Sequence, residues 1–506
     1  MRLAYWLAAA LIGASMPSTA QEMPKAAVKN LPEVFFGTTV DDPYRYMEEV
    51  KNPDVAKWMK AHANATNSTL SRIAGRKSML DSIVKYSDAV ESLVSDVVRA
   101  PGDLYFYEKR GAKENQFKLY MRKGLTGAEK LLVDPEVQAK ATGKPHAINY
   151  FNVSPTGSHV AYGMSKAGDE DAVLHVIDTA TGKLVGKPVD RAQFGGVVFS
   201  PDGKTIGFNR LQALKKGMPE TEKYQKSVVY SMPLAGPVAR AKPVFGMTTP
   251  GVSMQPAEIP FISISDDDRW VFGFVINGTQ RDFTLYAAPQ GTYLTRNPGW
   301  RKVFDAKDKI TGVAYMNNAL YMLTYRNASR FEMLKLDISS KIDLAAAQVV
   351  VPGSERVLTG MAAAKDALYF EARDGNIKRL FKLPYVANAA ANAQPVEVKL
   401  PVQGAFDLAG GESNWSAADP RFDGVTINLQ GWTRARQIYQ VNADGSVVNT
   451  GLQPKGPYDA PTDVTATEVM VKSHDGAMVP MSIIHKTGLK LDGTNPTILY
   501  GYASYG

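Results

Sequence analysis

The feature that most constrains the fold is a short motif of strand, turn and strand that recurs along the middle of the chain. Its clearest copies are Phe151–Tyr162 and Val198–Phe208, in which a Ser-Pro-x-Gly turn separates two apolar strands. Serine, proline, aspartate and glycine favour tight turns, and alternating apolar residues on both sides of them predict strands. The weaker copies are Ile262–Phe272, Ile310–Tyr325, Val357–Phe370 and Phe422–Trp432.

Many copies are followed by a further hairpin, as at Val173–Val185, so that one repeat contains four short strands. A repeat of about 50 residues with four strands is typical of a β-propeller, and the region from Asp96 to Val447 is long enough for about seven blades. An array of β-sandwiches is the main alternative. The nearly constant repeat unit and the lack of long linkers between copies favour the propeller.

Helices are predicted before the propeller. Asn52 is a good helix cap, Pro53 suits the first helical position, and Asp54 complements the positive end of the helix dipole. A second helix is expected around Arg76–Tyr86. The residues of the first helix that recur at helical spacing, and that we expect to form its buried face, are Val55, Trp58, Met59, His62, Thr66 and Leu70.

The first 20 residues have the features of a secretory signal. Arg2 precedes the apolar run Leu3–Ala14, and the small residues Ser18 and Ala20 suit a cleavage before Gln21. A short buried helix at the start of the fold is the alternative. A cleaved signal predicts a periplasmic or secreted protein. No apolar run reaches the length of about 18 residues that a membrane span needs, so we expect no stable membrane insertion after cleavage.

The composition excludes several kinds of chemistry. The chain has no cysteine, which rules out disulfides, thiol catalysis and thiolate metal sites. Its six histidines form no His-Glu-x-x-His pattern, and no glycine-rich phosphate loop occurs, so neither a metal nor another cofactor is expected. The net charge of +8 is spread along the chain without a basic block, and no nucleic-acid partner is predicted.

The last residues have the pattern of an α/β-hydrolase domain. Val471–Gly488 contains two short apolar strands around an Asp-Gly turn, and Asn495–Gly506 is expected to contribute a buried strand and a glycine-containing loop. In that fold a Gly-x-Ser-x-Gly elbow carries the nucleophile, and Asp or Glu and then His follow it. The 506 residues contain no such elbow. Ser473, His474 and Asp475 are consecutive, and neighbouring strand residues point to opposite faces, so they do not predict a triad.

Three segments, in the same order, resemble the prolyl oligopeptidase family. They are Asp42–Glu49 (Asp-Pro-Tyr-Arg-Tyr-Met-Glu-Glu), Ala147–Gly168, and Lys486–Tyr502, which ends in Leu-Tyr-Gly-Tyr. The resemblance implies a serine peptidase in which a propeller caps an α/β-hydrolase domain and restricts substrates to short peptides. It also implies that the N-terminal helices contact the hydrolase domain, and that a Ser-His-Asp triad transfers the acyl group without a metal.

The resemblance assigns roles to two tyrosines. Tyr502 matches the second tyrosine of Leu-Tyr-Gly-Tyr, whose phenol donates a hydrogen bond to the oxyanion, and Tyr505 falls where the prolyl enzymes have a phenylalanine near the substrate pocket. The alternatives are an aromatic at a strand end for Tyr502 and a solvent-facing loop tyrosine for Tyr505. The Ser-Tyr-Gly ending is closer to oligopeptidase B, which cleaves after Arg or Lys. The longer Lys-Leu-Asp-Gly spacer is closer to the prolyl enzymes, and cleavage after proline is favoured.

The expected organisation is therefore mostly β, with four segments. They are a signal peptide at 1–20, a helical segment at 21–90, a seven-bladed propeller at 91–450, and the start of an α/β-hydrolase domain at 451–506. The expected function is hydrolysis of short peptides. The chain lacks the catalytic serine, aspartate and histidine, and we expect it to be inactive by itself. A non-catalytic propeller that binds peptides or proteins is the alternative.

Overall fold

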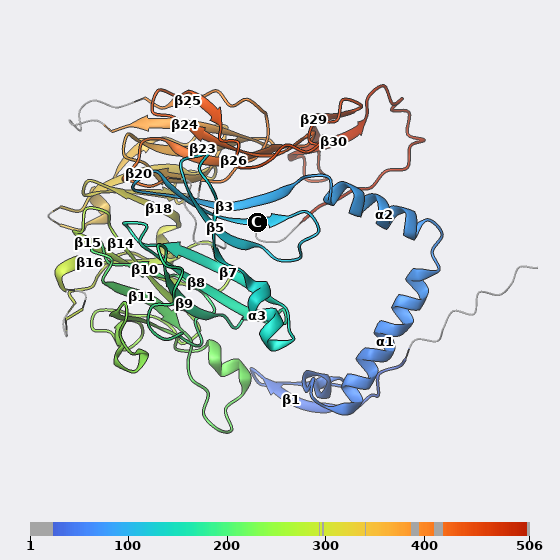
Figure 1. Cartoon of the computed structure of the whole chain (residues 1–506), viewed down its shortest axis with the longest axis horizontal. Helices are drawn as coiled ribbons and strands as arrows, with labels where there is room; N and C mark the ends of the chain where they lie inside the picture. Colours follow the sequence, from blue (N-terminus) through green and yellow to red (C-terminus); the bar gives the residue numbers. More distant parts are fainter. Residues whose placement is uncertain are drawn as a thin grey trace, which may run out of the picture. The chain divides into compact units, whose positions relative to one another are not determined.

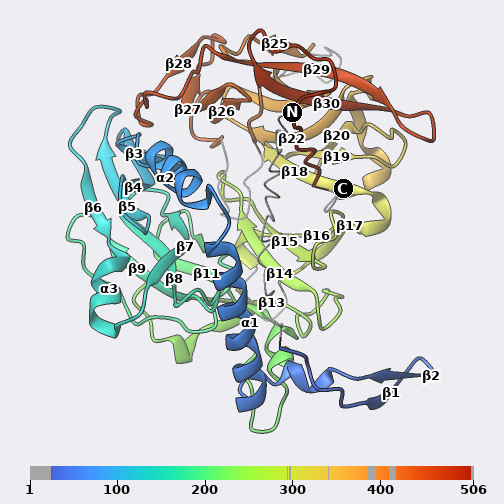
Figure 2. The ribbon, with the colours of Figure 1, turned by 90° about the vertical axis from the view of Figure 1, so that its right-hand side faces the viewer.

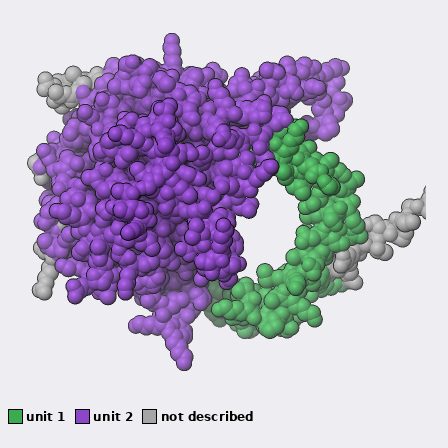
Figure 3. All heavy atoms as spheres, in the orientation of Figure 1, with its two compact units in different colours: residues 1–87 green, residues 88–506 purple. Residues whose placement is uncertain are grey.

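The computed structural model describes residues 24–292, 294–295, 298–339, 341–385, 394–408 and 418–502. The chain divides into two compact units, residues 1–87 and residues 88–506 (Figure 3). The expected signal peptide and Tyr505 lie outside the described residues. Within the described residues, no helix combines the length and the apolar character needed to cross a membrane.

The first unit contains a β-hairpin and two helices. Its elements are β1 (Leu31–Phe35), β2 (Thr38–Asp42), the short 3-10 helix η1 (Arg45–Glu48), α1 (Pro53–Ser71) and α2 (Arg76–Ser87). The side chain of Asn52 accepts a hydrogen bond from the backbone N–H of Asp54, as expected of the cap. Both predicted helices are present, whereas the hairpin was not predicted.

The buried face of α1 differs from the predicted one. Val55 and Ala65 are buried, whereas Met59 and Leu70 are exposed. Trp58 Nε1 donates a hydrogen bond of 3.1 Å to the carbonyl of Pro24, and His62 Nε2 lies 2.6 Å from the same oxygen. The segment that contains Pro24 therefore covers the side of α1 that carries Trp58 and His62.

The second unit is built around seven small antiparallel sheets arranged in a ring (Figures 1 and 2). Blade 1 comprises β3 (Ser92–Ala100), β4 (Leu104–Gly111), β5 (Lys118–Lys123) and β6 (Lys130–Val133), and α3 (Pro135–Thr142) follows it. Blade 2 comprises β7 (His146–Val153), β8 (His159–Lys166) and β9 (Val173–Asp178). Blade 3 comprises β10 (Val198–Phe199), β11 (Thr205–Arg210), β12 (Val228–Pro233) and β13 (Lys242–Phe245).

The remaining blades follow in chain order. Blade 4 comprises β14 (Ile259–Ile264), β15 (Trp270–Ile276), β16 (Thr284–Pro289) and β17 (Arg301–Phe304). Blade 5 comprises β18 (Ile310–Met316), β19 (Ala319–Thr324), β20 (Glu332–Asp337) and β21 (Gln348–Val351). Blade 6 comprises β22 (Val357–Ala363), β23 (Ala367–Asp374), β24 (Ile377–Pro384) and β25 (Val396–Val398). Blade 7 comprises β26 (Val425–Gly431), β27 (Arg434–Val441) and β28 (Val447–Asn449).

Isolated bridges supply the fourth strand of the two blades with three named strands. Leu174 and Ile177 of β9 pair with Val189 and Leu184 in blade 2, and Ala405 pairs with Gln430 of β26 in blade 7. The predicted seven-bladed propeller is therefore confirmed. The motif Phe151–Tyr162 spans β7 and β8, as expected. Phe422–Trp432 contains only β26, because the innermost strand of blade 7 passes through Ala405, well before that range.

Apolar side chains from neighbouring blades form the core. Phe106 and Leu119 of blade 1 pack with Val160 of blade 2, and all three are fully buried. Each such side chain contributes about 2 kcal/mol of hydrophobic free energy, so the seams between blades hold the ring together. Over the described residues, each sheet consists of consecutive strands, and no strand is shared between blade 1 and blade 7.

Side chains therefore close the ring between its first and last blades. Tyr107 of blade 1 packs with Ile438 of blade 7. Gln453 accepts a hydrogen bond from Val94 N–H and donates one to Ser92 C=O, both of 2.9 Å. The side chain of Gln453 thus gives hydrogen-bond partners to the N–H of Val94 and the C=O of Ser92 at the edge of β3, in place of an additional strand.

A nine-residue hairpin follows the propeller. β29 (Val464–Lys472) pairs along its whole length with β30 (Met478–Lys486), which confirms the predicted strands on both sides of the Asp-Gly turn. The expected strand in Asn495–Gly506 is not formed within the described residues, and Ile498 and Leu499 are 95% and 85% exposed. A strand needs a paired neighbour, and Thr497–Tyr502 does not pair with β30.

Candidate functional site

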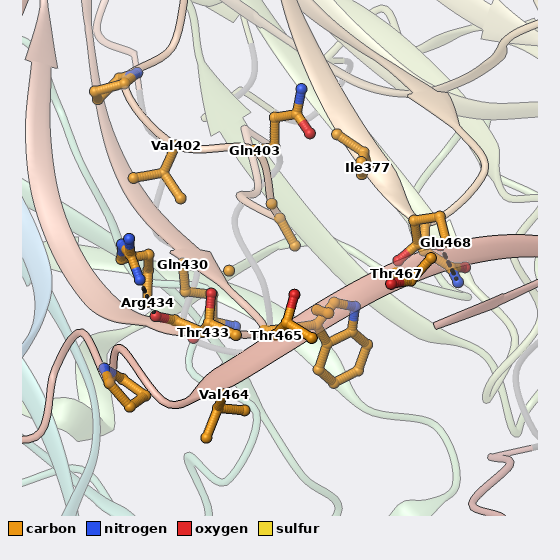
Figure 4. Close-up of a pocket in the computed structure, with 18 of the residues that line it drawn as sticks. Ile377, Val402, Gln403, Gln430, Thr433, Arg434, Val464, Thr465, Thr467 and Glu468 are labelled. Carbon is orange, nitrogen blue, oxygen red and sulfur yellow. Dashed lines mark hydrogen bonds between the residues drawn. The ribbon is translucent and has the colours of Figure 1, made fainter. Parts of the chain in front are cut away.

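The candidate site is a cavity of about 1200 Å³ where the β29–β30 hairpin meets blades 6 and 7 (Figure 4). Three stretches of the propeller and the first half of β29 form most of its walls. The lining residues that the site's chemistry depends on are Asn376, Gln403, Gly404, Gln430, Gly431, Trp432, Thr433, Arg434, Thr465, Thr467 and Glu468. Its volume is somewhat larger than the roughly 300–1,000 Å³ of a typical small-molecule pocket, which leaves room for a short peptide segment.

Two glycines let the backbones at the floor of the cavity approach closely. Ala405 and Gln430 exchange backbone hydrogen bonds of 2.8 and 3.1 Å. A Cβ on Gly404 would lie 1.7 Å from the carbonyl oxygen of Gln430, and one on Gly431 would lie 2.8 Å from the carbonyl oxygen of Gln403. Only glycine at these two positions allows the strand through Ala405 to lie against β26.

A hydrogen-bonded cluster attaches the hairpin to blade 6. Asn376, in the turn between β23 and β24, donates to Glu468 Oε2 of β29 at 3.1 Å and to Ser482 Oγ of β30 at 2.9 Å. Ser482 Oγ in turn donates to Glu468 Oε1 at 2.5 Å. The carboxylate thus has a partner on each oxygen, which fixes the side of the cavity that β29 forms.

The cavity presents groups that suit a peptide. Arg434 and Glu468 lie on opposite sides of the labelled residues in Figure 4, with amide and hydroxyl side chains between them. Trp432 is 60% exposed and offers an apolar ring. Amides and hydroxyls can bond a peptide backbone, and an aromatic face can contact a proline ring or another apolar side chain.

A buried ion pair lies beneath the cavity. Glu371 of β23 is 2% exposed, and its carboxylate lies 2.9 Å from Lys378 Nζ, which also pairs with Asp407. Burial raises the pKa of Glu371, and the Lys378 ammonium opposes that effect. The backbone N–H of Lys378 donates to Gly404 C=O at 2.9 Å, so the pair is connected to the floor.

Of the two predicted site residues, only Tyr502 lies within the part of the chain that the structure describes. Tyr502 is 70% exposed and does not line the cavity, and Tyr505 lies outside the described residues. Ser473, His474 and Asp475 form the exposed turn between β29 and β30, where Asp475 accepts a hydrogen bond from Ala477 N–H. This geometry provides no base oriented by a carboxylate. Among the described residues, no group of three or more side chains could hold a metal ion.

The cavity itself was not predicted from the sequence. Gly431-Trp-Thr433 is recognisable as a turn after an apolar strand, and a tryptophan in a turn was the one available signal. Gly404 and Glu468 give no such signal, because their partners are 26 and 92 residues away in the chain, at Gln430 and Asn376.

Residues 24–444 match the family described as "Prolyl oligopeptidase, N-terminal beta-propeller domain". The chain belongs to the prolyl oligopeptidase family. A prolyl endopeptidase from Elizabethkingia meningoseptica is 23% identical over 491 residues, which cover 94% of this chain and 63% of that relative. The chain thus spans less than two thirds of the length of this family member.

Solved structures of family members have the same fold. One of two prolyl endopeptidases studied for inter-domain dynamics has a TM-score of 0.79 at 23% identity, covering 96% of this chain and 67% of that one. Prolyl oligopeptidase B from Galerina marginata, bound to a 25mer macrocyclization substrate, has a TM-score of 0.76 at 17% identity, covering 93% and 66%. The resemblance that the sequence motifs carry is therefore confirmed at the level of family and fold.

Proposed function

We propose that this chain is the propeller-bearing part of a prolyl oligopeptidase-type serine peptidase that hydrolyses short peptides after proline. The observation that carries the proposal is the family match over residues 24–444, with the hairpin β29–β30 following directly. The matched Elizabethkingia protein is named a prolyl endopeptidase, and the Galerina enzyme was solved with a peptide substrate.

In this proposal the remaining hydrolase strands and helices cover apolar faces that are exposed here. On α2, Met79 and Ile83 are 67% and 55% exposed, and on the hairpin Met470 and Met478 are 54% and 53% exposed. Apolar faces of this kind are usually buried against another layer of structure. Their occurrence in both the N-terminal unit and the hairpin supports a hydrolase domain built from both ends of the propeller.

The chemistry would be acyl transfer by a serine, with histidine as base and aspartate orienting it. For this chemistry the 506 residues offer one candidate group, Tyr502 as the proposed oxyanion donor, and they contain no nucleophile elbow. We therefore infer that this chain alone hydrolyses no peptide bond. The apolar run at Leu3–Ala14 supports export, and we propose a periplasmic or secreted enzyme.

A fluorophosphonate probe tests the catalytic assignment, because it labels only activated serines. The 506-residue chain should remain unlabelled, and the product of a reading frame that continues beyond codon 506 should be labelled once, in a Gly-x-Ser-x-Gly sequence. Labelling of a serine within residues 24–502 would contradict the assignment. A continuing frame without that sequence would favour the non-catalytic propeller instead.

A further inference from the structure

A short segment of blade 7, residues 419–424, contacts four other blades. We call it the axial segment. Gly424 N–H donates to Asp366 Oδ1, and Lys365 N–H donates to Phe422 C=O, each at 2.8 Å, so the segment is bound to blade 6. The guanidinium of Arg99 in blade 1 lies 4.6 Å from the centre of the Phe422 ring.

Arg421 extends the contacts to two further blades. Its Nη1 donates to Pro155 C=O in blade 2 at 2.5 Å, and its Nε lies 3.9 Å from Asp266 Oδ1 in blade 4. Its Nε and Nη2 also bind the carboxylate of Asp419, at 2.9 and 2.5 Å. One guanidinium thus contacts blades 2, 4 and 7.

These three blades are pairwise non-adjacent in the ring. Blade 3 separates blades 2 and 4, blades 5 and 6 separate blades 4 and 7, and blade 1 separates blades 7 and 2. Blades of a propeller surround a central channel, and non-neighbouring blades can meet only over its axis. The guanidinium of Arg421 therefore lies across the end of the channel.

The repeat motif explains why these positions face the axis. Pro155 and Asp266 follow the serine of the same turn, Ser154-Pro155 in blade 2 and Ser265-Asp266 in blade 4. The turn joins the first strand of a blade to the second, at β7–β8 and at β14–β15. Aspartate thus replaces the proline of the motif in blade 4, and it supplies the acidic partner of Arg421.

This end of the channel is the one remote from the hairpin. In an antiparallel blade, successive turns lie on opposite faces of the ring. Asp366 is in the first turn of blade 6, whereas Asn376, which binds the hairpin, is in its second turn. The axial segment and β29–β30 therefore lie at opposite faces of the propeller.

We propose that the axial segment is a plug that closes the channel at this face, with Arg421 as its latch. The consequence for a peptide substrate, which rests on the proposed function, is that it can reach the channel only from the face that carries the hairpin. The plug itself is independent of any catalytic activity. A planar guanidinium can bond three partners in different directions, which a lysine ammonium does not reproduce in the same geometry.

Single-cysteine labelling tests the plug, because the natural chain contains no cysteine to interfere. Ala364→Cys places a thiol at a fully buried position beside Lys365, whose N–H binds the axial segment. With Arg421→Ala in the same chain, we expect a small thiol reagent to modify this cysteine at least tenfold faster. Arg421→Lys should give an intermediate rate.

Two controls distinguish local opening of the plug from destabilisation of the whole propeller. Arg379→Ala removes an arginine whose ion pairs, with Asp374 and Glu397, stay within blade 6, and labelling at position 364 should not change. Ala161→Cys, buried in β8, should stay unreactive with Arg421→Ala. Equal labelling of Ala364→Cys with and without Arg421 would overturn the proposal, as would equal acceleration at both cysteine positions. If Arg421→Ala fails to fold, Asp266→Asn provides the same comparison.

Discussion

At the scale of single residues, the propeller contains buried carboxyl groups whose ionisation opposes folding. Glu108 on β4 is the clearest case. Burial, with a smaller contribution from the nearby Asp96 carboxylate, raises the pKa of Glu108 from 4.5 to about 8. Arg436 of blade 7 lies near the same Asp96. Glu108, whose side chain is half-buried, is therefore mostly protonated at pH 7 in the folded chain and ionised in the unfolded one.

The sign of the resulting pH dependence follows from proton binding. Between about pH 4.5 and 8 the folded state holds a proton on Glu108 that the unfolded state has released, so the free energy of unfolding falls as pH rises. Glu108→Gln should remove most of that slope, measured by urea unfolding at pH 5 and pH 8. Glu355→Gln, at a 97% exposed side chain, is the control and should keep the slope. An unchanged slope in Glu108→Gln would contradict the assignment.

Gly404 is a second residue whose identity the packing determines. Gly404→Ala would place a Cβ 1.7 Å from the Gln430 carbonyl and push the innermost strand of blade 7 off β26. We expect a loss of about 1–3 kcal/mol in the free energy of unfolding. Gly291→Ala, where a Cβ would meet no atom within 4 Å, should change it by less than about 0.5 kcal/mol. Equal stability of the two variants would show that the floor tolerates a side chain.

Tyr502 is the residue whose substitution tests the proposed catalytic assignment most directly. In an enzyme that includes the hydrolase domain, Tyr502→Phe would remove the proposed oxyanion donor and should lower kcat about 100-fold with little change in KM. Tyr500→Phe, two residues earlier and 82% exposed, should leave both constants nearly unchanged. A similar loss in both variants would assign the effect to the strand rather than to the phenol.

At the scale of elements, the hairpin β29–β30 depends on blade 6 for its position. Asn376 binds both of its strands, through Glu468 and Ser482. Asn376→Ala should therefore increase amide hydrogen exchange across Val464–Lys486 while leaving blade 6 protected. Asn442→Ala, which removes a bond to Ser446 within a single turn, should have no effect on the hairpin. Unchanged exchange in Asn376→Ala would mean that other contacts hold the hairpin.

The elements also show what can be read from the sequence. Alternating apolar residues around Ser-Pro-x-Gly turns predict β7–β8 and β10–β11, because both the turn and the strand pattern are local. The face of α1 was predicted wrongly at Met59 and Leu70, because it depends on Pro24, which lies in a different segment. The strand expected in Asn495–Gly506 is not formed over the described residues 495–502, because the sequence carries the strand pattern but pairing depends on a partner elsewhere in the fold.

The candidate cavity could not be predicted from the sequence either, because its walls come from segments that are distant in the chain. Gly404 meets Gln430 within blade 7, and Asn376 of blade 6 meets Glu468 of the hairpin, across 26 and 92 residues of sequence. Tyr502 could be singled out because the role proposed for it comes with a local motif, Leu-Tyr-Gly-Tyr. A role for Arg421 could not be predicted from the sequence, because its partners Pro155 and Asp266 lie in other blades.

At the scale of the whole molecule, side chains rather than a shared strand close the ring. Gln453→Ala would remove two hydrogen bonds to β3 of blade 1 and leave the buried N–H of Val94 without that partner. We expect about 1–3 kcal/mol of destabilisation and faster hydrogen exchange confined to the seam between blades 1 and 7. Gln212→Ala, at a bond to Glu222 within blade 3, should leave this seam unchanged. Exchange spread evenly over all blades would contradict a local closure.

We propose that this propeller serves a peptidase that cleaves after proline and that the 506 residues by themselves supply no nucleophile for the reaction. The most direct measurement is hydrolysis of two matched chromogenic peptides, with proline or arginine before the scissile bond. It is made with this chain and with the product of a frame extending through a hydrolase domain. We predict no hydrolysis by this chain and preferential cleavage of the proline peptide by the longer product. Hydrolysis by the 506-residue chain would contradict its proposed inactivity. A preference of the longer product for the arginine peptide would contradict the proposed cleavage after proline.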